Sequence, residues 1–375
     1  MHEMIYITVS FLVGLFASSH AMPILIKVAR HTKQLSVPKN LSATIDRIPT
    51  LGGIGIFWGF IMGLTLTSDG YVFPGLNYVV SVVTIMFFVG LKCDIDKNSA
   101  LIKLASEICV ASILIFLGHF RFTNLHGFLG IETIPFGASV LLTGLIYIVL
   151  INAFNLIEAI DGLAAGLSIF AASVFGVWFF LTNHFELSIV SFSLIGGLSG
   201  FFLFNVYGTK NKILMGNSGS LILGTIMAFL VIEFNELNLD KGTPYFAMAA
   251  PAVSFSILIY LLLELLRVFS IRFIQRISPF TANKNHTFHR LLVLRLKQRF
   301  VTFLILAICT AFTITAFELQ WIGINELMLF NFLAGGILLI LPAALARRRI
   351  KSSEDYLLQK IVHKNEVNQL SGSIS

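Results

Sequence analysis

The sequence predicts an all-α, polytopic integral membrane protein, and composition and patterning both carry this prediction. Hydrophobic residues make up 56% of the 375-residue chain and charged residues only 12%, and the mean hydropathy is +0.87. A soluble domain usually has about 25% charged residues. The basic residues also cluster in short loops between long apolar runs, as in proteins that cross a membrane several times.

Eleven apolar runs approach the length of about 20 residues that a helix needs to cross a bilayer core. We therefore expect 10–11 transmembrane helices in one membrane domain, residues 1–350, followed by a polar cytoplasmic tail, residues 351–375. The runs are centred near Leu15, Phe60, Thr84, Ala111, Leu145, Ser173, Ile195, Ala228, Leu258, Leu306 and Ile337.

The distribution of basic residues predicts the orientation of the helices. When the loops are assigned alternately to the two sides, about 24 of the 26 Lys and Arg residues fall on one side, and only Arg121 and Lys241 on the other. Such an excess marks the cytoplasmic side, so the N-terminus is expected outside. The net charge of +7 then reflects membrane orientation, and nucleic-acid binding is not expected.

Four polar clusters interrupt the apolar pattern, and all fall on the predicted cytoplasmic side. They are residues 92–97, 152–162, 205–220 and 283–290. Within the second cluster, Asn152, Asn155 and Glu158 recur at helical spacing and share one face. Ionisable and amide groups at membrane depth are costly, and by default they face a protein interior or a water-filled cavity. The clusters are therefore candidates for a functional site.

Each cluster also has a purely structural interpretation. Ion pairs at a helix end are common and weak, and membrane asparagines often hydrogen-bond neighbouring helices. A Gly/Ser run can be a capped turn, and two histidines three residues apart are more often packing or surface residues than ligands. Because all four clusters fall on one face, we favour a common site.

The chemistry of the clusters favours a phosphorylated substrate held with a divalent cation. The Gly/Ser segment 215–220 opens an apolar run, and such a loop can present backbone N–H groups to an anion at a helix N-terminus. Mg²⁺ takes oxygen ligands, typically one or two carboxylates together with substrate phosphates. The basic loop 283–290 would bind phosphates or anionic lipid headgroups.

At these residues the chain resembles the polyprenyl-phosphate N-acetylhexosamine-1-phosphate transferases, the superfamily that includes phospho-N-acetylmuramoyl-pentapeptide transferase. The most specific segments are Asn-Ala-Phe-Asn-Leu-Ile, which begins at Asn152, and Met-Gly-x-Ser-Gly-Ser-Leu, which begins at Met215. The similar segments keep the family's order and spacing, and they are residues 49–53, 90–96, 152–166, 201–224 and 286–292.

The resemblance implies an activity and a location. The enzyme would transfer a sugar-1-phosphate from a UDP-sugar to an undecaprenyl-type lipid phosphate and release UMP, with Mg²⁺ as cofactor. It would act at the cytoplasmic face of the inner (plasma) membrane and initiate cell-envelope polysaccharide synthesis. Whether the protein forms a homodimer stays an open question.

The resemblance also implies roles for individual residues. Asp94, Asp96 and Asp161 would be catalytic, and Asp94, Asp161 and Asn217 would bind the metal. Substrate binding is expected of Asn152, Asn155, Glu158, Asn205, Lys212, Asn217, His286, His289 and Arg290.

The chain departs from the family at positions that carry charge. The family's adjacent Asp pair is Cys93-Asp94 here, the Asp of its second motif is Glu158, and the Asp of its Met-Gly-Asp segment is Asn217. Cys and Asn are poorer ligands for Mg²⁺ than carboxylates are, so metal affinity is expected to fall.

Two alternatives to an active transferase stay open. One is a catalytically silent relative that binds polyprenyl phosphate or a partner transferase. The other is a membrane transporter, although no inverted repeat supports it. We favour the enzyme, because Asp94, Asp96, Glu158 and Asp161 leave four carboxylates that are expected to reach one cytoplasmic cavity.

Overall fold

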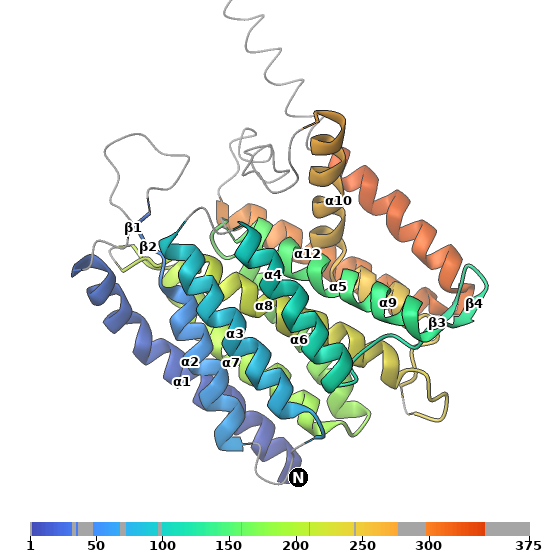
Figure 1. Ribbon diagram of the computed structural model, residues 1–375, viewed down its shortest axis with the longest axis horizontal. Coiled ribbons are helices and arrows are strands. Elements are labelled where there is room, and N and C mark those ends of the chain that lie inside the picture. Colours follow the sequence, from blue (N-terminus) through green and yellow to red (C-terminus); the bar gives the residue numbers. More distant parts are fainter. Residues whose placement is uncertain are drawn as a thin grey trace, which may run out of the picture.

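Long apolar helices make up most of the structure, a computed structural model (Figure 1). It describes residues 2–31, 35–36, 48–67, 73–96, 100–158, 160–209, 211–243, 245–276 and 298–341. The helices are α1 (His2–His31), α2 (Gly52–Thr67), α3 (Leu76–Ile95), α4 (Ala100–Ser112), α5 (Phe136–Ile157), α6 (Leu163–Leu181), α7 (Phe185–Val206), α8 (Gly216–Leu237), α9 (Ala250–Ile257), α10 (Ile259–Ile274), α12 (Gln298–Leu319) and an unlabelled helix, Ile324–Leu341. The π-helical turn η1 (Ile113–Leu117) extends α4, and the 3₁₀ turn η2 (Gln320–Ile322) follows α12.

Each of the eleven predicted apolar runs contains a helix. Among the described residues, nine helices are long and apolar enough to cross a membrane, and the bent pair α9 and α10 can form a tenth span. The remaining run forms α2, which is apolar but has only 16 residues. The prediction of a polytopic α-helical membrane protein is confirmed.

One predicted span is not straight. The run centred on Leu258 was expected to be a single helix, but it breaks there, and α9 and α10 meet at a bend of 79°. The backbone of Leu258 leaves the helical region, with φ −104° and ψ 17°. Both halves contact α12, but α9 also packs on α8 whereas α10 packs on α5. Figure 1 shows α10 turned away from the direction of the other helices.

Large apolar side chains cover much of the outer surface. Phe16 of α1, Leu101 of α4 and Leu141 of α5 are 74%, 83% and 76% exposed, and many other exposed aromatic and aliphatic side chains accompany them. A soluble monomer rarely exposes contiguous apolar surface on this scale. The surface therefore suits a lipid environment.

Two small pairs of strands lie at opposite ends of the bundle (Figure 1). The strands β1 (Leu35–Ser36) and β2 (Ile48–Pro49) pair antiparallel, with Leu35 opposite Pro49. The strands β3 (Asn124–Phe128) and β4 (Ile131–Thr133) form the other antiparallel pair. Because the helices alternate in direction, the starts of α2, α4, α6, α8 and α12 share the β1–β2 end with the ends of α1, α3, α5, α7 and α10.

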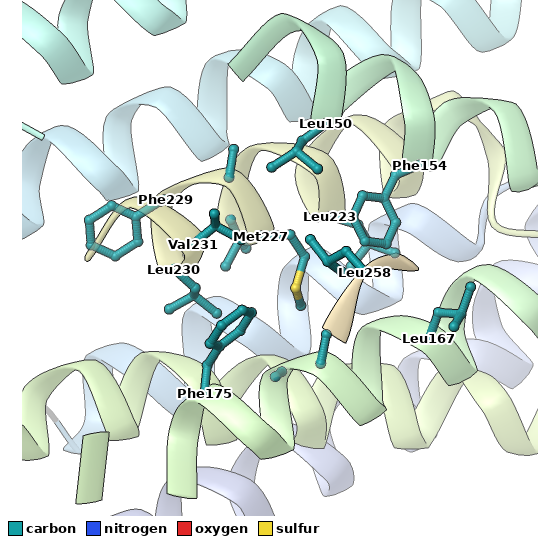
Figure 2. Close-up of a cluster of buried hydrophobic side chains, with 14 of the residues drawn as sticks. Leu150, Phe154, Leu167, Phe175, Leu223, Met227, Phe229, Leu230, Val231 and Leu258 are labelled. Carbon is teal, nitrogen blue, oxygen red and sulfur yellow. The ribbon is translucent and has the colours of Figure 1, made fainter. Parts of the chain in front are cut away.

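Helix α8 lies at the centre of the bundle. In its most apolar 18-residue window, 83% of the residues are buried, compared with 28% in α1. It contacts α2, α3, α5, α6 and α9. Figure 2 shows Met227 and Leu230 of α8 between Leu150 of α5 and Phe175 of α6. The first turn of α8 is therefore surrounded by other helices.

Glycine lets α3 approach the start of α8 at backbone contact. A Cβ atom at Gly90 would lie 2.3 Å from Ser218 Cα and 2.6 Å from its backbone nitrogen. Any larger residue at position 90 would push the two helices apart. This close approach brings the last turn of α3 to the first turn of α8.

We predict that Gly90→Ala lowers the thermal stability of the detergent-purified protein, because overpacking a core costs about 1–3 kcal/mol. The matched control is Gly144→Ala in α5, where a Cβ would meet only Ile115 Cδ1, at 3.9 Å. Alanine favours helix over glycine, so this control should be neutral or stabilising. Equal effects of the two substitutions on the melting temperature would contradict the predicted close packing.

Candidate functional site

The first turn of α8 is capped by two carboxylates from other parts of the chain. Asp94 of α3 accepts hydrogen bonds from the backbone N–H groups of Asn217, at 2.7 Å, and Ser218, at 3.1 Å. Glu158, which follows α5, accepts one from the N–H of Gly216, at 2.9 Å. The first N–H groups of a helix have no partner inside the helix, and that end carries about half a positive charge. The two carboxylates accept hydrogen bonds from these N–H groups and place negative charge at the positive end of the helix.

Gly216 makes room for this contact. Its φ of +78° lies in the left-handed region that favours glycine. A Cβ there would lie 2.8 Å from Asp94 Oδ2 and 2.5 Å from the carbonyl oxygen of Thr50. A side chain at position 216 would therefore displace the carboxylate of Asp94.

Backbone pairing fixes the segment that precedes α8. The N–H of Leu214 donates to the carbonyl of Pro49 at 2.7 Å, and the N–H of Gly52 donates to the carbonyl of Leu214 at 2.9 Å. The N–H of Gly53 donates to the carbonyl of Met215 at 2.7 Å. The segments before α2 and before α8, which are distant in the sequence, are thus held side by side.

Asparagine side chains join α5 to α8. Asn217 donates from Nδ2 to Asp94 Oδ1 at 2.9 Å, and its Oδ1 accepts from Asn155 Nδ2 at 2.9 Å. Asn155 Nδ2 also lies 2.9 Å from Ser220 Oγ, to which it donates. A continuous line of side-chain hydrogen bonds therefore runs from α5 through α8 to α3.

A lysine and a glutamate of α4 extend this line. Lys103 Nζ donates to Asn155 Oδ1 at 2.8 Å and lies 3.8 Å from Glu107 Oε1. Glu107 accepts a hydrogen bond from Asn152 Nδ2 at 2.6 Å through its other oxygen. The side chain of Glu107 is 1% exposed and that of Lys103 17%. Lys103 also interacts electrostatically with Glu158.

Lys103 and Glu107 were not among the predicted site residues. The available signal was a lysine followed four residues later by a glutamate inside an apolar run, since such a pair shares one helix face. Ionisable groups at membrane depth are also functional candidates by default.

A second ion pair lies beside the first turn of α8. Lys212 forms a salt bridge with Asp161, which follows α5. Asn205 of α7 accepts from the N–H of Gly162 at 2.6 Å and donates to the carbonyl of Ile213 at 2.8 Å. These contacts tie the turn between α5 and α6 to the segment before α8.

Several predicted site residues do lie together at the β1–β2 end. Asn152, Asn155 and Glu158 bind α4 and α8 along one side of α5, so the prediction of a shared face is confirmed. Asp96 instead ends α3 at an exposed position, where its N–H donates to the carbonyl of Lys92. The predicted residues His286, His289 and Arg290 lie outside the described residues.

One expectation about the site is wrong. The loop before α8 was expected to offer backbone N–H groups to a substrate anion, but Asp94 and Glu158 already bind those of residues 216–218. Of the four carboxylates expected to reach one cavity, Asp94 and Glu158 both bind the first turn of α8, Asp161 pairs with Lys212, and Asp96 is exposed at the end of α3. Within the described part of the chain, no group of three or more His, Cys, Asp or Glu residues is placed to hold a metal ion.

The predicted metal ligands do not fit a resident Mg²⁺ in this arrangement. Both oxygens of Asp94 accept hydrogen bonds from α8, and Asn217 turns its amide nitrogen towards Asp94. Asp161 is neutralised by Lys212. Mg²⁺ demands oxygen ligands in near-octahedral geometry, and these side chains already use their oxygens within the protein.

We predict that Asp94→Ala destabilises the protein by several kcal/mol, because hydrogen bonds to a charged group contribute about 1.5–3 kcal/mol each. Asp240→Ala is the matched control, since Asp240 also accepts a backbone N–H, that of Gly242 at 2.9 Å, but at an exposed position. The control should change stability by less than about 0.5 kcal/mol. Unfolding of both variants in detergent checks this, and similar losses would rule out a special role for the cap on α8.

Comparison with known proteins finds a family similarity in the region that contains the site. Residues 76–235 match the family model of glycosyl transferase family 4. This stretch begins at α3 and reaches the last turn of α8, so it contains Asp94, Lys103, Asn155 and Asn217. The polar network described above therefore lies inside the matched region.

Curated relatives extend the similarity over most of the chain. The chain is 28% identical to the "Probable undecaprenyl-phosphate N-acetylglucosaminyl 1-phosphate transferase" of Bacillus subtilis, over 85% of this chain and 86% of the relative. It is 28% identical to the "Decaprenyl-phosphate N-acetylglucosaminephosphotransferase" of Mycobacterium tuberculosis, over 72% of each. It is 24% identical to the "Undecaprenyl-phosphate alpha-N-acetylglucosaminyl 1-phosphate transferase" of Escherichia coli K12, over 70% of each. The chain is therefore similar to polyprenyl-phosphate N-acetylglucosamine-1-phosphate transferases over most of its length, and to glycosyl transferase family 4 over residues 76–235.

Proposed function

We propose that the chain transfers an N-acetylhexosamine-1-phosphate from a UDP-sugar to a polyprenyl phosphate of the undecaprenyl type. An oxygen of the lipid phosphate attacks the sugar-bound phosphorus, the bond between the two phosphates of the UDP-sugar breaks, and UMP leaves. The observation that carries the proposal is that the region matched to the family, residues 76–235, builds the polar network around α8. Because the relatives are named for N-acetylglucosamine, we propose this sugar first.

We propose that the site faces the cytoplasm from the plasma membrane. The described basic residues of the β1–β2 end include Lys92, Lys103 and Lys212, whereas Arg121 and Lys241 lie towards the opposite end. An excess of Lys and Arg marks the cytoplasmic side. A water-soluble nucleotide sugar would reach the network from that side, and a lipid phosphate from the surrounding bilayer. The product would start the assembly of a cell-envelope polysaccharide.

Individual residues take different roles in this proposal. Lys103 and Lys212, whose side chains are 17% and 27% exposed, supply positive charge for substrate phosphates. Asp161 orients Lys212, and Asp94 acts as a positioning residue that holds α8. The uridine diphosphate group would be bound by His286, His289 and Arg290.

Magnesium takes no step in this proposal. Enzymes of glycosyl transferase family 4 are generally Mg²⁺-dependent. The side chains around residues 94 and 217 do not fit a resident ion, so every role above is assigned to the protein's own groups.

The test is a transfer assay in membranes that lack a competing transferase, with radiolabelled UDP-N-acetylglucosamine and undecaprenyl phosphate. We expect label in the lipid fraction and an equal amount of UMP. Lys103→Met should lower the rate at least about tenfold, because one charge-stabilising group is typically worth about 10²–10³ in rate. Lys241→Met, in the loop after α8 at the opposite end, is the matched control and should leave the rate unchanged.

The same assay separates the alternatives. If no labelled lipid forms while the Escherichia coli relative is active in parallel, the transferase proposal fails and a silent relative is favoured. Uptake of intact nucleotide sugar into proteoliposomes, without a lipid product, would instead indicate a transporter.

A further inference from the structure

Asp94 and Asn217 are in direct contact. If both positions carried a carboxylate, the two side chains could bind one cation between them. Asp94 Oδ1 accepts from the backbone nitrogen and the side-chain nitrogen of Asn217, at 2.7 Å and 2.9 Å. Its Oδ2 accepts from the N–H of Ser218 at 3.1 Å. Three donors from one helix turn thus surround a single carboxylate.

The orientation of the Asn217 amide is fixed from the other side. Its Oδ1 accepts from Asn155 Nδ2, so the amide nitrogen must face Asp94. The Asn155 amide is oriented in turn, because its oxygen accepts from Lys103 Nζ at 2.8 Å. An aspartate at position 217 would instead set two carboxylates within hydrogen-bond distance, which requires a cation or a proton between them.

Positive charge is already present around this contact. The ammonium of Lys103 is hydrogen-bonded to Asn155, one side chain away from Asn217. Lys212 neutralises Asp161, and the positive end of α8 faces Asp94 and Glu158. Each described carboxylate of the network therefore has a partner supplied by the protein.

We infer that this site binds its phosphorylated ligand without a resident divalent cation, and that Asn217 is the residue that removes the need for one. The amide of Asn217 takes the place of an ion next to Asp94, and Lys103 supplies cationic charge to the same line of hydrogen bonds. The inference rests on the proposed function for the class of ligand, but the state of the metal site can be measured without any substrate.

The test is binding of Mn²⁺, a paramagnetic substitute for Mg²⁺, to the purified full-length chain, followed by electron paramagnetic resonance. We expect no stoichiometric Mn²⁺ site in the natural sequence and a gain of one site per chain in Asn217→Asp. Asn238→Asp is the matched control, because Asn238 is also a buried asparagine but caps the other end of α8. It should gain no site.

Stoichiometric Mn²⁺ binding by the natural chain, removed by Asp94→Asn, would overturn the inference. If Asn217→Asp fails to fold, the measurement on the natural chain still decides the question. In the transfer assay, activity that survives excess EDTA supports the inference, and activity abolished by EDTA and restored by Mg²⁺ contradicts it. If the chain transfers no sugar phosphate, only the proposed function fails, and the Mn²⁺ result stands by itself.

Discussion

The carboxylate of Asp94 against the first turn of α8 is the interaction on which the rest of the site depends. Helix α8 is the most buried of the nine spanning helices in the described part of the chain, so its first N–H groups have little access to water. A buried donor without a partner costs about 1–3 kcal/mol. Asp94 and Glu158 remove this cost, and in doing so they fix α3 and the end of α5 against α8.

This cap also decides the electrostatics of the site. The carboxylates that a phosphoryl-transfer site could use for a metal ion are already bound, two by the start of α8 and one by Lys212. Asn217 continues the same pattern, because it hydrogen-bonds to Asp94 and adds no charge of its own. The region that is similar to glycosyl transferase family 4 therefore contains a polar network whose carboxylates are already bound inside the protein.

Most of the fold, but only part of the site, could be predicted from the sequence. Apolar runs predict helices because each must satisfy its own backbone in lipid, and the spacing of Asn152, Asn155 and Glu158 predicts a shared face because helical geometry is local. The bend at Leu258 depends on which helices α9 and α10 pack against. Two contacts of the site depend on how distant helices are rotated towards each other. They are the hydrogen bond of Lys103 to Asn155 and the capping of residues 217 and 218 by Asp94. The spacing of residues in the sequence does not determine how distant helices pack or rotate.

Hydrogen–deuterium exchange at the first turn of α8 tests most directly whether carboxylates from other helices cap this turn. The N–H groups of Gly216, Asn217 and Ser218 have no acceptor inside the helix, so any protection must come from outside it. We expect slow exchange at all three groups in the natural protein, and we expect Asn217 and Ser218 to lose more protection than Gly216 in Asp94→Asn. Rapid exchange at Asn217 and Ser218 in the natural protein, equal to that in the variant, would contradict this expectation.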